Sequence, residues 1–248
     1  MKIVGVIPAR YASTRFPGKP LTVINGKSMI QRVFEQALKC SGLYKIIVAT
    51  DHETIAGHVR NFGGAVMMTG SHHLSGTERC SEVADRLIAG GEEFDYLINI
   101  QGDEPFLAPQ QIGQLIKGLE GDRPVIATLI KKIENQDDIH NPNVVKVAVD
   151  KKGYALLFSR SPIPFARNCS TSDWMTAATY FKHIGIYAYQ SQILREIVTL
   201  PTTMLERTEM LEQLRWLENG YPILTYQTEY ESIAIDDPSD LLKITNKL

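Results

Sequence analysis

The feature of this sequence that most constrains its fold is the alternation of short apolar runs with segments of helical period. Apolar runs at 2–9, 45–51, 65–68, 96–103 and 125–130 have the length of strands. Between them, apolar residues recur every three or four positions, as on the buried face of a helix. Strands that alternate with helices build βαβ units around a mostly parallel sheet. We therefore predict an α/β fold, with helices flanking a mostly parallel central sheet.

Boundary signals place the helices of this first half. A helix is predicted from Ser28 to Lys39, and Gly42 follows its last turn as a stop signal. Ser75 and Glu78 have the spacing of a capping box, which opens a helix that runs through Ile88. A further helix is expected to begin near Pro109, because proline suits the first helical turn.

After Asn141 the pattern favours antiparallel structure. The elements predicted there are a hairpin turned at Asp150–Gly153, a mobile loop at 168–178, a strand at 181–189, one helix at 205–220, a last strand at 231–236 and a short helix from Pro238. We interpret 141–222 as an antiparallel extension of a single domain spanning 1–248, because the end of the chain returns to the pattern of the first sheet.

Charge and cysteine content exclude several classes of protein. The 26 basic and 28 acidic side chains give a net charge of −2, which does not suit a nucleic-acid-binding protein. Three cysteines without metal-ligand spacing favour reduced thiols in a cytoplasmic protein. The first apolar run is broken by Pro8 and ends at Arg10, so we expect neither a signal peptide nor a membrane span.

The run "IPARYASTRFPGKPL" at 7–21 places a cationic loop directly after a strand. Arg10, Arg15 and Lys19 lie within it, and no apolar face accompanies them. Ligands of an open parallel sheet bind at the carboxyl ends of its strands, so this loop is a candidate for binding a triphosphate. It matches neither the Walker A pattern nor GxGxxG. The alternative is a solvated cationic turn.

Two carboxylates follow apolar runs in the same manner. Asp103 ends "INIQGD" and Asp236 ends "IAID". Magnesium prefers a few protein oxygens combined with substrate phosphates, so both are candidate ligands of Mg²⁺. A helix cap or a turn is the structural alternative for each aspartate. Together with the cationic loop, the pair matches the needs of phosphoryl or nucleotidyl transfer.

Ordered motifs along nearly the whole chain closely resemble the 3-deoxy-manno-octulosonate cytidylyltransferase family. They are "IPARYASTRFPGKPL", "IVATDHE", "SGTER", "INIQGDEP", "NPNVVKV", "ALLFSRSPIP", "HIGIYAY", "EMLEQLR" and "IDDPSDL". The resemblance implies a Rossmann-like nucleotidyltransferase fold, a homodimer and dependence on Mg²⁺. It also implies transfer of CMP from CTP to 3-deoxy-D-manno-octulosonate (Kdo), with release of diphosphate, for lipopolysaccharide synthesis.

The same resemblance implies roles for individual residues. Segments 1–140 and 223–248 would hold nucleotide and metal, and 141–222 would bind the sugar and form the dimer. Implied nucleotide contacts are Arg10, Ser13, Arg15, Lys19, Ser75, Thr77, Arg79 and Gln101. Implied metal ligands are Asp103 and Asp236, which with Arg10 and Lys19 form the implied catalytic set. Implied sugar-binding residues are Arg160, His183, Tyr187, Glu212 and Gln213.

Alternatives stay open at this point. His183 also fits a satisfied core histidine, and the adjacent Glu212 and Gln213 must point in different directions on one helix. The substrate could be another acidic sugar, either 8-amino-Kdo or a sialic acid. A nucleotide-binding regulatory protein without turnover is a further alternative, whereas a dehydrogenase is disfavoured because the dinucleotide glycine pattern is absent.

Overall fold

The computed structural model of the chain describes residues 1–12, 16–231, 233–235 and 237–245. The chain forms two compact units. Unit 1 consists of Met1–Ile116 and Ser232–Leu248, and unit 2 consists of Lys117–Glu231. The predicted functional division at 140/141 and 222/223 stays a prediction.

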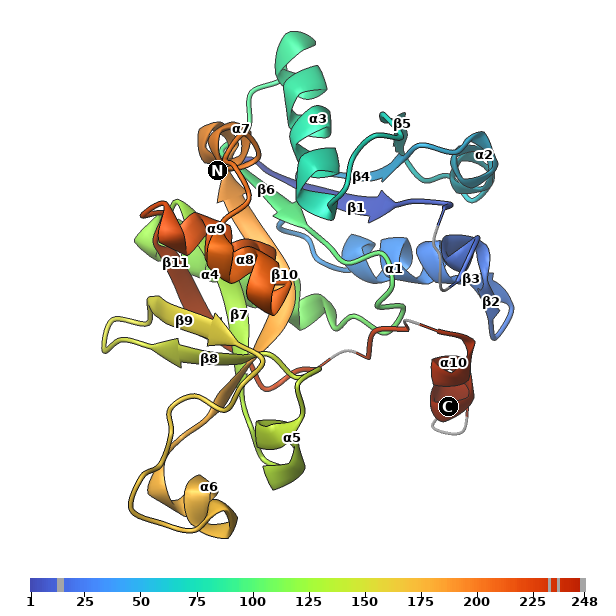
Figure 1. The fold of residues 1–248 in the computed structure, drawn as a ribbon. Helices are drawn as coiled ribbons and strands as arrows, with labels where there is room; N and C mark the ends of the chain where they lie inside the picture. Colours follow the sequence, from blue (N-terminus) through green and yellow to red (C-terminus); the bar gives the residue numbers. More distant parts are fainter. Residues whose placement is uncertain (13–15, 232, 236, 246–248) are drawn as a thin grey trace. The chain divides into compact units, whose positions relative to one another are not determined.

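Unit 1 is built on a parallel sheet (Figure 1). Its strands are β1 (Ile3–Ala9), β4 (Lys45–Thr50), β5 (Val66–Met68) and β6 (Tyr96–Asn99). Their order across the sheet is β6-β1-β4-β5. β1 is central and almost wholly buried, as its continuous apolar sequence requires in a sheet covered on both faces. The predicted parallel sheet is therefore confirmed.

The helices of unit 1 begin at the predicted signals. They are α1 (Met29–Leu38), α2 (Glu53–Asn61), α3 (Gly76–Ala89) and α4 (Pro109–Asp122), the last of which runs on into unit 2. Ser28 Oγ accepts a hydrogen bond from the N–H of Gln31, and Ser75 Oγ accepts one from the N–H of Glu78. Figure 1 shows α1 and α3 on opposite sides of β1. Between β1 and α1 lie a 3-10 turn at Lys19–Leu21 and the short antiparallel pair β2 (Val23–Ile24) and β3 (Lys27–Ser28).

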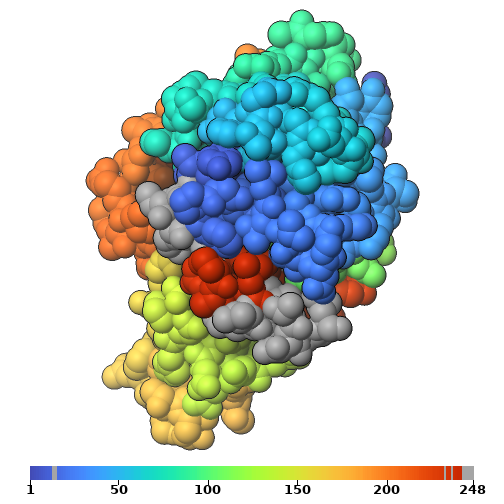
Figure 2. All heavy atoms as spheres, turned by 90° about the vertical axis from the view of Figure 1, so that its right-hand side faces the viewer, coloured from blue at the N-terminus to red at the C-terminus, as the bar shows by residue number. Residues whose placement is uncertain are grey.

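The end of the chain packs on the beginning of unit 1. Helix α10 (Pro238–Thr245) starts at the predicted proline. Leu241 on this helix and Phe16 pack against a buried cluster of Ile24, Met29 and Ile235. Figure 2 shows the red C-terminal helix beside the blue N-terminal segment. The C-terminal return to the first sheet, expected from the sequence, thus brings residues near 235 to the loop after β1.

Unit 2 contains the antiparallel part of the fold. Its strands are β7 (Ile126–Lys132), β8 (Lys146–Val149), β9 (Ala155–Ser159), β10 (Phe181–Gln190) and β11 (Ile223–Gln227). β7 pairs with β10 antiparallel and with β11 parallel, while β8 pairs antiparallel with both β9 and β10. The predicted hairpin turned near Gly153 is confirmed, and this glycine has the positive φ of +86° that the turn requires.

The helix predicted at 205–220 is two helices instead of one. The helices of unit 2 are α5 (Gln136–His140), α6 (Trp174–Ala177), α7 (Ser191–Ile197), α8 (Met204–Glu209) and α9 (Glu212–Glu218). Met210 adopts a left-handed conformation with φ of +54°, which ends α8 and turns the chain before α9 begins. Helical periodicity on both sides of the break concealed it in the sequence.

Two further predictions are corrected. The last strand is Ile223–Gln227, not 231–236, since Glu231 and 233–235 are not in a strand. The predicted mobile loop at 168–178 contains a 3-10 turn at Thr171–Asp173 and helix α6. Trp174 explains this order, because its buried side chain packs with Ile139 and Tyr180. In the part of the chain that the structure describes, no helix is long and apolar enough to span a membrane.

Candidate functional site

Unit 1 has a cavity of about 260 Å³ at the carboxyl ends of β1 and β6. Pro8 and Ala9, at the end of β1, form part of its wall. The charged and polar side chains that line it are Arg10, Lys19, His73, Ser75, Arg79, Gln101 and Asp103. The cavity thus collects predicted nucleotide and metal residues from three separate segments, at the sheet edge where open parallel sheets bind ligands.

A cation and a carboxylate meet in this cavity. Lys19 Nζ donates a hydrogen bond of 2.8 Å to Asp103 Oδ2, and the two side chains are 15% and 28% exposed. Both groups are therefore partly accessible to a ligand that enters the cavity. Arg10 beside them is exposed. A phosphate chain and a divalent cation are the kind of ligands that such a mixed pair can take.

The backbone around Asp103 is held from two sides. Gly102 lies so close to β1 that a Cβ atom there would be 2.5 Å from the carbonyl oxygen of Pro8. On the other side, the N–H of Ile235 donates a hydrogen bond of 3.0 Å to the carbonyl oxygen of Asp103. The "QGD" sequence therefore needs its glycine for close approach to the strand, and the aspartate that follows is fixed at the rim of the cavity.

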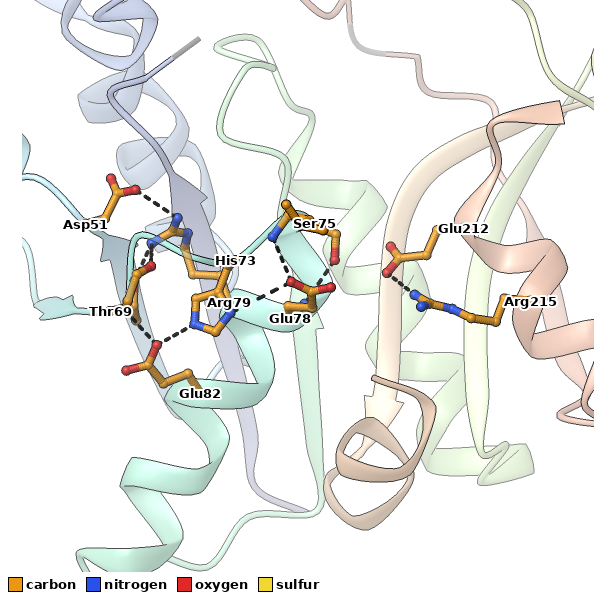
Figure 3. Close-up of polar contacts among 11 residues, drawn as sticks. Asp51, Thr69, His73, Ser75, Glu78, Arg79, Glu82, Glu212 and Arg215 are labelled. Atoms are coloured by element: carbon orange, nitrogen blue, oxygen red, sulfur yellow. Dashed lines mark hydrogen bonds and ion pairs between the residues drawn. The ribbon is translucent and has the colours of Figure 1, made fainter. Parts of the chain in front are cut away.

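Arg79 reaches the cavity from α3 but is mostly committed to neighbouring protein groups (Figure 3). Its guanidinium donates to Thr69 Oγ1, to the carbonyl oxygen of Gly70 and to Asp51 Oδ2. Only 3% of its side chain is exposed. These hydrogen bonds connect α3 to the residue that follows β4 and to the two residues that follow β5. Arg79 therefore has a structural role in the wall of the cavity, with or without a contact to a ligand.

A second polar cluster lies at the start of α3. His73 lines the cavity, and its Nε2 is 2.5 Å from Glu82 Oε2, which also accepts from the N–H of Gly70 (Figure 3). Burial works against the charge of Glu82, but hydrogen bonds from His73 and Gly70 and the charge of Arg86 together lower its pKa to about 2. Glu82 therefore stays ionised and holds the loop before Ser75 in place.

Some predicted nucleotide and metal residues are not placed in the cavity. Thr77 is buried in α3 and does not line it. Ser13, Arg15 and Asp236 lie outside the described residues. Among the residues that are described, no group of three or more histidine, cysteine, aspartate or glutamate side chains has the arrangement of a metal site. Roles for all of these residues stay predictions.

In unit 2, four of the five predicted sugar-binding residues fall on β10 and α9. His183 is enclosed by the aromatic rings of Phe158 and Tyr187, both at 5.2 Å between ring centroids, although part of its surface remains accessible. This burial lowers the pKa of His183 to about 4. Burial, and then the charge of Glu212, raise the pKa of Tyr187 well above its usual value. The histidine and the tyrosine are therefore neutral near neutral pH.

The neighbours Glu212 and Gln213 behave differently, as their adjacent positions on a helix require. Glu212 is partly exposed and accepts a hydrogen bond of 2.9 Å from Arg215 (Figure 3). Gln213 is buried. The charge of Glu212 also helps to raise the pKa of Tyr187 on β10. Tyr187 on β10 packs against Trp216 of α9, with 5.2 Å between the ring centroids, and the part of the four residues in sugar binding stays a prediction.

Arg160 is engaged with backbone carbonyl groups. Its Nε donates to the carbonyl oxygen of Glu209 at 2.7 Å, and its Nη1 donates to that of Pro142 at 2.9 Å. The carboxylate of Glu209 in turn accepts from Ser159 Oγ and from the N–H of Arg160. The guanidinium thus connects β9 with α8 and with the turn before β8. A purely structural role is as consistent with these bonds as carboxylate binding.

Sequence reasoning missed several residues that shape these sites. One of them is His73, because nothing in the sequence around it signals the contact with Glu82. Asp51 directly follows the apolar run of β4, in the same way that Asp103 follows the apolar run that contains β6. The signal that predicted Asp103 as a site residue could therefore have identified Asp51 as well. Glu209 and Thr128 have no such signal, because their contacts come from distant parts of the sequence.

Comparison with known proteins gives a consistent family. The family described as "Cytidylyltransferase" matches residues 4–233. The 3-deoxy-manno-octulosonate cytidylyltransferase of Parabacteroides distasonis is 51% identical, over 98% of this chain and 96% of the relative. The protein of the same name from Cytophaga hutchinsonii is 49% identical, over 99% of this chain and 97% of the relative.

Solved structures agree on the fold. A structure of CMP:2-keto-3-deoxy-manno-octonic acid synthetase complexed with CTP matches with a TM-score of 0.91 and 41% identity, over 100% of both chains. A 4-diphosphocytidyl-2C-methyl-D-erythritol synthase, 14% identical with a TM-score of 0.65 over 98% of this chain and 96% of its own, shares the fold alone. The predicted nucleotidyltransferase fold is confirmed, and the chain belongs to the 3-deoxy-manno-octulosonate cytidylyltransferase family of nucleotidyltransferase enzymes.

Proposed function

We propose that this chain transfers the CMP group of CTP to the anomeric hydroxyl of Kdo and releases diphosphate, as a step of lipopolysaccharide biosynthesis. The observation that carries the proposal is the match, over nearly the full length of both chains, to relatives that bear the name of this activity. The cavity in unit 1 supports it, because Arg10, Lys19 and Asp103 line one space at the sheet edge.

The reaction is an in-line displacement at phosphorus. The anomeric oxygen of Kdo bonds to the α-phosphorus, the bond from that phosphorus to the β-phosphate bridge breaks, and its electron pair leaves with diphosphate. The hydroxyl proton is lost to solvent. Arg10 and Lys19 would balance the charge that develops on the phosphate oxygens. Such a displacement needs no covalent intermediate with the protein.

Asp103 fits a magnesium site that relies on substrate oxygens. Its carboxylate is partly exposed and is paired with the ammonium group of Lys19, whose place a metal ion could take. Mg²⁺ usually binds only one or two protein carboxylates together with substrate phosphates. Asp236 would be the second ligand. When bound, Mg²⁺ neutralises phosphate charge and lowers the pKa of a coordinated hydroxyl. Binding requires Lys19 to release Asp103, and a phosphate of CTP is the partner that Lys19 would then take.

The remaining predicted residues divide between the two substrates. Ser75 and Gln101 line the cavity and are proposed to contact CTP, together with Thr77 and Arg79 in the wall and Ser13 and Arg15 in the loop. His183, Tyr187, Glu212 and Gln213 are proposed to bind Kdo, with Arg160 on its carboxylate. We thus propose that 1–140 and 223–248 serve nucleotide and metal, and that 141–222 serves the sugar.

We propose a homodimer formed through the 141–222 segment. Large apolar side chains are exposed there, which favours burial against a second copy. They are Leu156, Leu157, Phe165, Met175, Met204 and Met210. Sedimentation velocity of the chain, and of a variant with Leu156 and Met210 changed to serine, would measure the association.

We also propose that the protein acts in the cytoplasm. Cys40, Cys80 and Cys169 are free thiols, the state that a reducing compartment maintains. Fractionation of the cells that make the protein would test this assignment.

Diphosphate release tests the proposed reaction directly. The purified chain, CTP and Mg²⁺ are combined with Kdo, 8-amino-Kdo and a sialic acid in turn, and Kdo is expected to give the fastest release. UTP in place of CTP exchanges a donor for an acceptor, so CTP should be preferred roughly a hundredfold or more. Faster turnover with a sialic acid would assign another substrate, and no release with any sugar would leave a nucleotide-binding protein without turnover.

A further inference from the structure

Thr128 on β7 lies opposite an irregularity in β10. The antiparallel register pairs Ile184 with Leu129 and then shifts, so that Tyr187 lies opposite Thr128. This shift changes the direction of the β10 side chains between His183 and Tyr187. Thr128 is fully buried, with 0% of its surface exposed.

The hydroxyl of Thr128 contacts three groups from β10. Its Oγ1 is 2.8 Å from the carbonyl oxygen of Ile186, 3.2 Å from that of Ile184 and 3.1 Å from His183 Nε2. A hydroxyl has one proton to donate, and a carbonyl oxygen can only accept. The proton of Thr128 therefore goes to the carbonyl groups, with the shorter contact to Ile186. Of these three groups, only His183 Nε2 can donate to Oγ1, which also lies near the hydroxyl group of Tyr187.

These contacts decide the protonation of the imidazole. If the hydroxyl donated to Nε2 instead, its oxygen would face two carbonyl oxygens without a proton between them, inside the protein. A neutral imidazole carries its proton on one nitrogen only, and burial keeps His183 neutral by lowering its pKa to about 4. With the proton on Nε2, the other nitrogen, Nδ1, presents a lone pair.

We propose that Thr128 is a positioning residue that fixes His183 in the Nε2–H form, so that Nδ1 accepts a hydrogen bond from a hydroxyl group of the sugar. A carboxylate cannot bind there, because it also only accepts. The histidine thus selects a hydroxyl, and the carboxylate of the substrate must be bound elsewhere. Assignment of the ligand as a sugar rests on the proposed function, whereas the form of the imidazole does not.

The first test reads the imidazole without any substrate. In the full chain with ¹⁵N-labelled histidine, long-range ¹H–¹⁵N spectra near neutral pH should show His183 with a protonated Nε2 and an unprotonated Nδ1. A His183→Gln variant identifies the signal by its loss. Protonation on Nδ1 instead would overturn the proposal even if the enzyme turns over Kdo normally.

Variants of Thr128 provide the second test. Thr128→Val keeps the shape but removes the hydroxyl, so the Nε2–H form should lose its dominance and the KM for Kdo should rise roughly tenfold or more, with the KM for CTP unchanged. Thr128→Ser should restore both properties. Thr225→Val is the matched control, because Thr225 is also a buried strand threonine but donates to the carbonyl oxygen of Gly153. It should lower stability without changing His183.

The outcomes separate this proposal from the proposed function. The positioning role would be overturned if Thr128→Val left both the His183 spectrum and the KM for Kdo unchanged. It would also be overturned if Thr128→Ser were as impaired as Thr128→Val. If Thr128→Val fails to fold, the spectrum of the unmodified chain still decides the form of the imidazole. Absence of turnover with Kdo in the unmodified chain would contradict the function and leave the spectrum valid.

Discussion

Lys19 Nζ lies 2.8 Å from Asp103 Oδ2, although the two residues follow different strands of unit 1. Each is thus the partner of the other when the cavity holds no ligand. Because a phosphate competes for the ammonium and a metal ion competes for the carboxylate, CTP and Mg²⁺ should each weaken this pair and favour binding of the other. Calorimetric titration of CTP should therefore show tighter binding with Mg²⁺ than without it.

Asp103→Asn keeps the size of the side chain but removes its charge. Turnover should fall by several orders of magnitude, on the order of a thousandfold or more, because neutralisation of the phosphate charge is lost, while CTP binding survives in part. Steady-state rates of diphosphate release measure it. Asp95→Asn is the matched control, since Asp95 precedes the same strand at its other end and accepts from the N–H of Lys2. Near-normal turnover of Asp103→Asn would show that Asp103 is not a metal ligand.

Gly102→Ala tests the close approach of the "QGD" segment to β1. The added methyl group would meet the carbonyl oxygen of Pro8 at 2.5 Å, so the segment must move and take Asp103 with it. Turnover should fall on the order of a hundredfold, because a displacement of about 1 Å is costly in an active site. In α2, by contrast, a Cβ on Gly57 meets nothing within 4 Å, so Gly57→Ala should raise the free energy of unfolding by about 0.5–1 kcal/mol. Urea unfolding and diphosphate release measure the two effects, and normal turnover in Gly102→Ala would contradict the first.

Arg160→Lys separates carboxylate binding from structural support. Lysine keeps the charge but loses the planar fork and the bond from Nε to Glu209, so we expect the KM for Kdo to rise about tenfold or more and the KM for CTP to stay constant. Kinetics with each substrate varied in turn, and thermal unfolding of the same samples, give the result. A fall in melting temperature with no change in the KM for Kdo would assign Arg160 to structural support alone.

Glu82→Gln should produce a pH-dependent loss of stability. The pKa of Glu82 is lowered from 4.5 to about 2 in the folded chain, so its charge stabilises the fold fully above the unfolded value. Near neutral pH the free energy of unfolding of the variant should be lower than that of the unmodified chain by on the order of 2 kcal/mol. This difference should shrink as the pH falls from about 4.5 towards 2. Urea unfolding over this range measures it. The control is Glu53→Gln, which removes an exposed ion pair with Arg60 and should change the free energy of unfolding little at any pH. A loss of stability in Glu82→Gln that does not depend on pH would contradict the lowered pKa of Glu82.

Local patterns predicted the parallel strands of unit 1 and the starts of several of its helices, but the strand predicted at 231–236 was wrong. β1, β4 and β6 are short, mostly buried apolar runs, and Ser28 and Ser75 begin their helices as their hydroxyl groups predict. In unit 2 the decisive features are not local. The break at Met210 depends on a backbone conformation that helical periodicity cannot reveal, and the order around Trp174 depends on its packing with distant residues.

The candidate site divides in the same way. Strand-end patterns predicted that Lys19 and Asp103 would lie together, because parallel strands end at one edge of a sheet. Sequence could not reveal that Arg160 would be bonded to Glu209, or that Thr128 would face His183. Both contacts join residues far apart in the chain, and the contact of Thr128 with His183 also depends on a register shift between β7 and β10.

The hydrogen bond from Ile235 to the carbonyl oxygen of Asp103 has a consequence for the growing polypeptide. Translation completes the strand before Asp103 well before it reaches Ile235, the residue that secures this segment from its other side. An unfinished chain can therefore form the parallel strands of unit 1 while the aspartate remains unsecured.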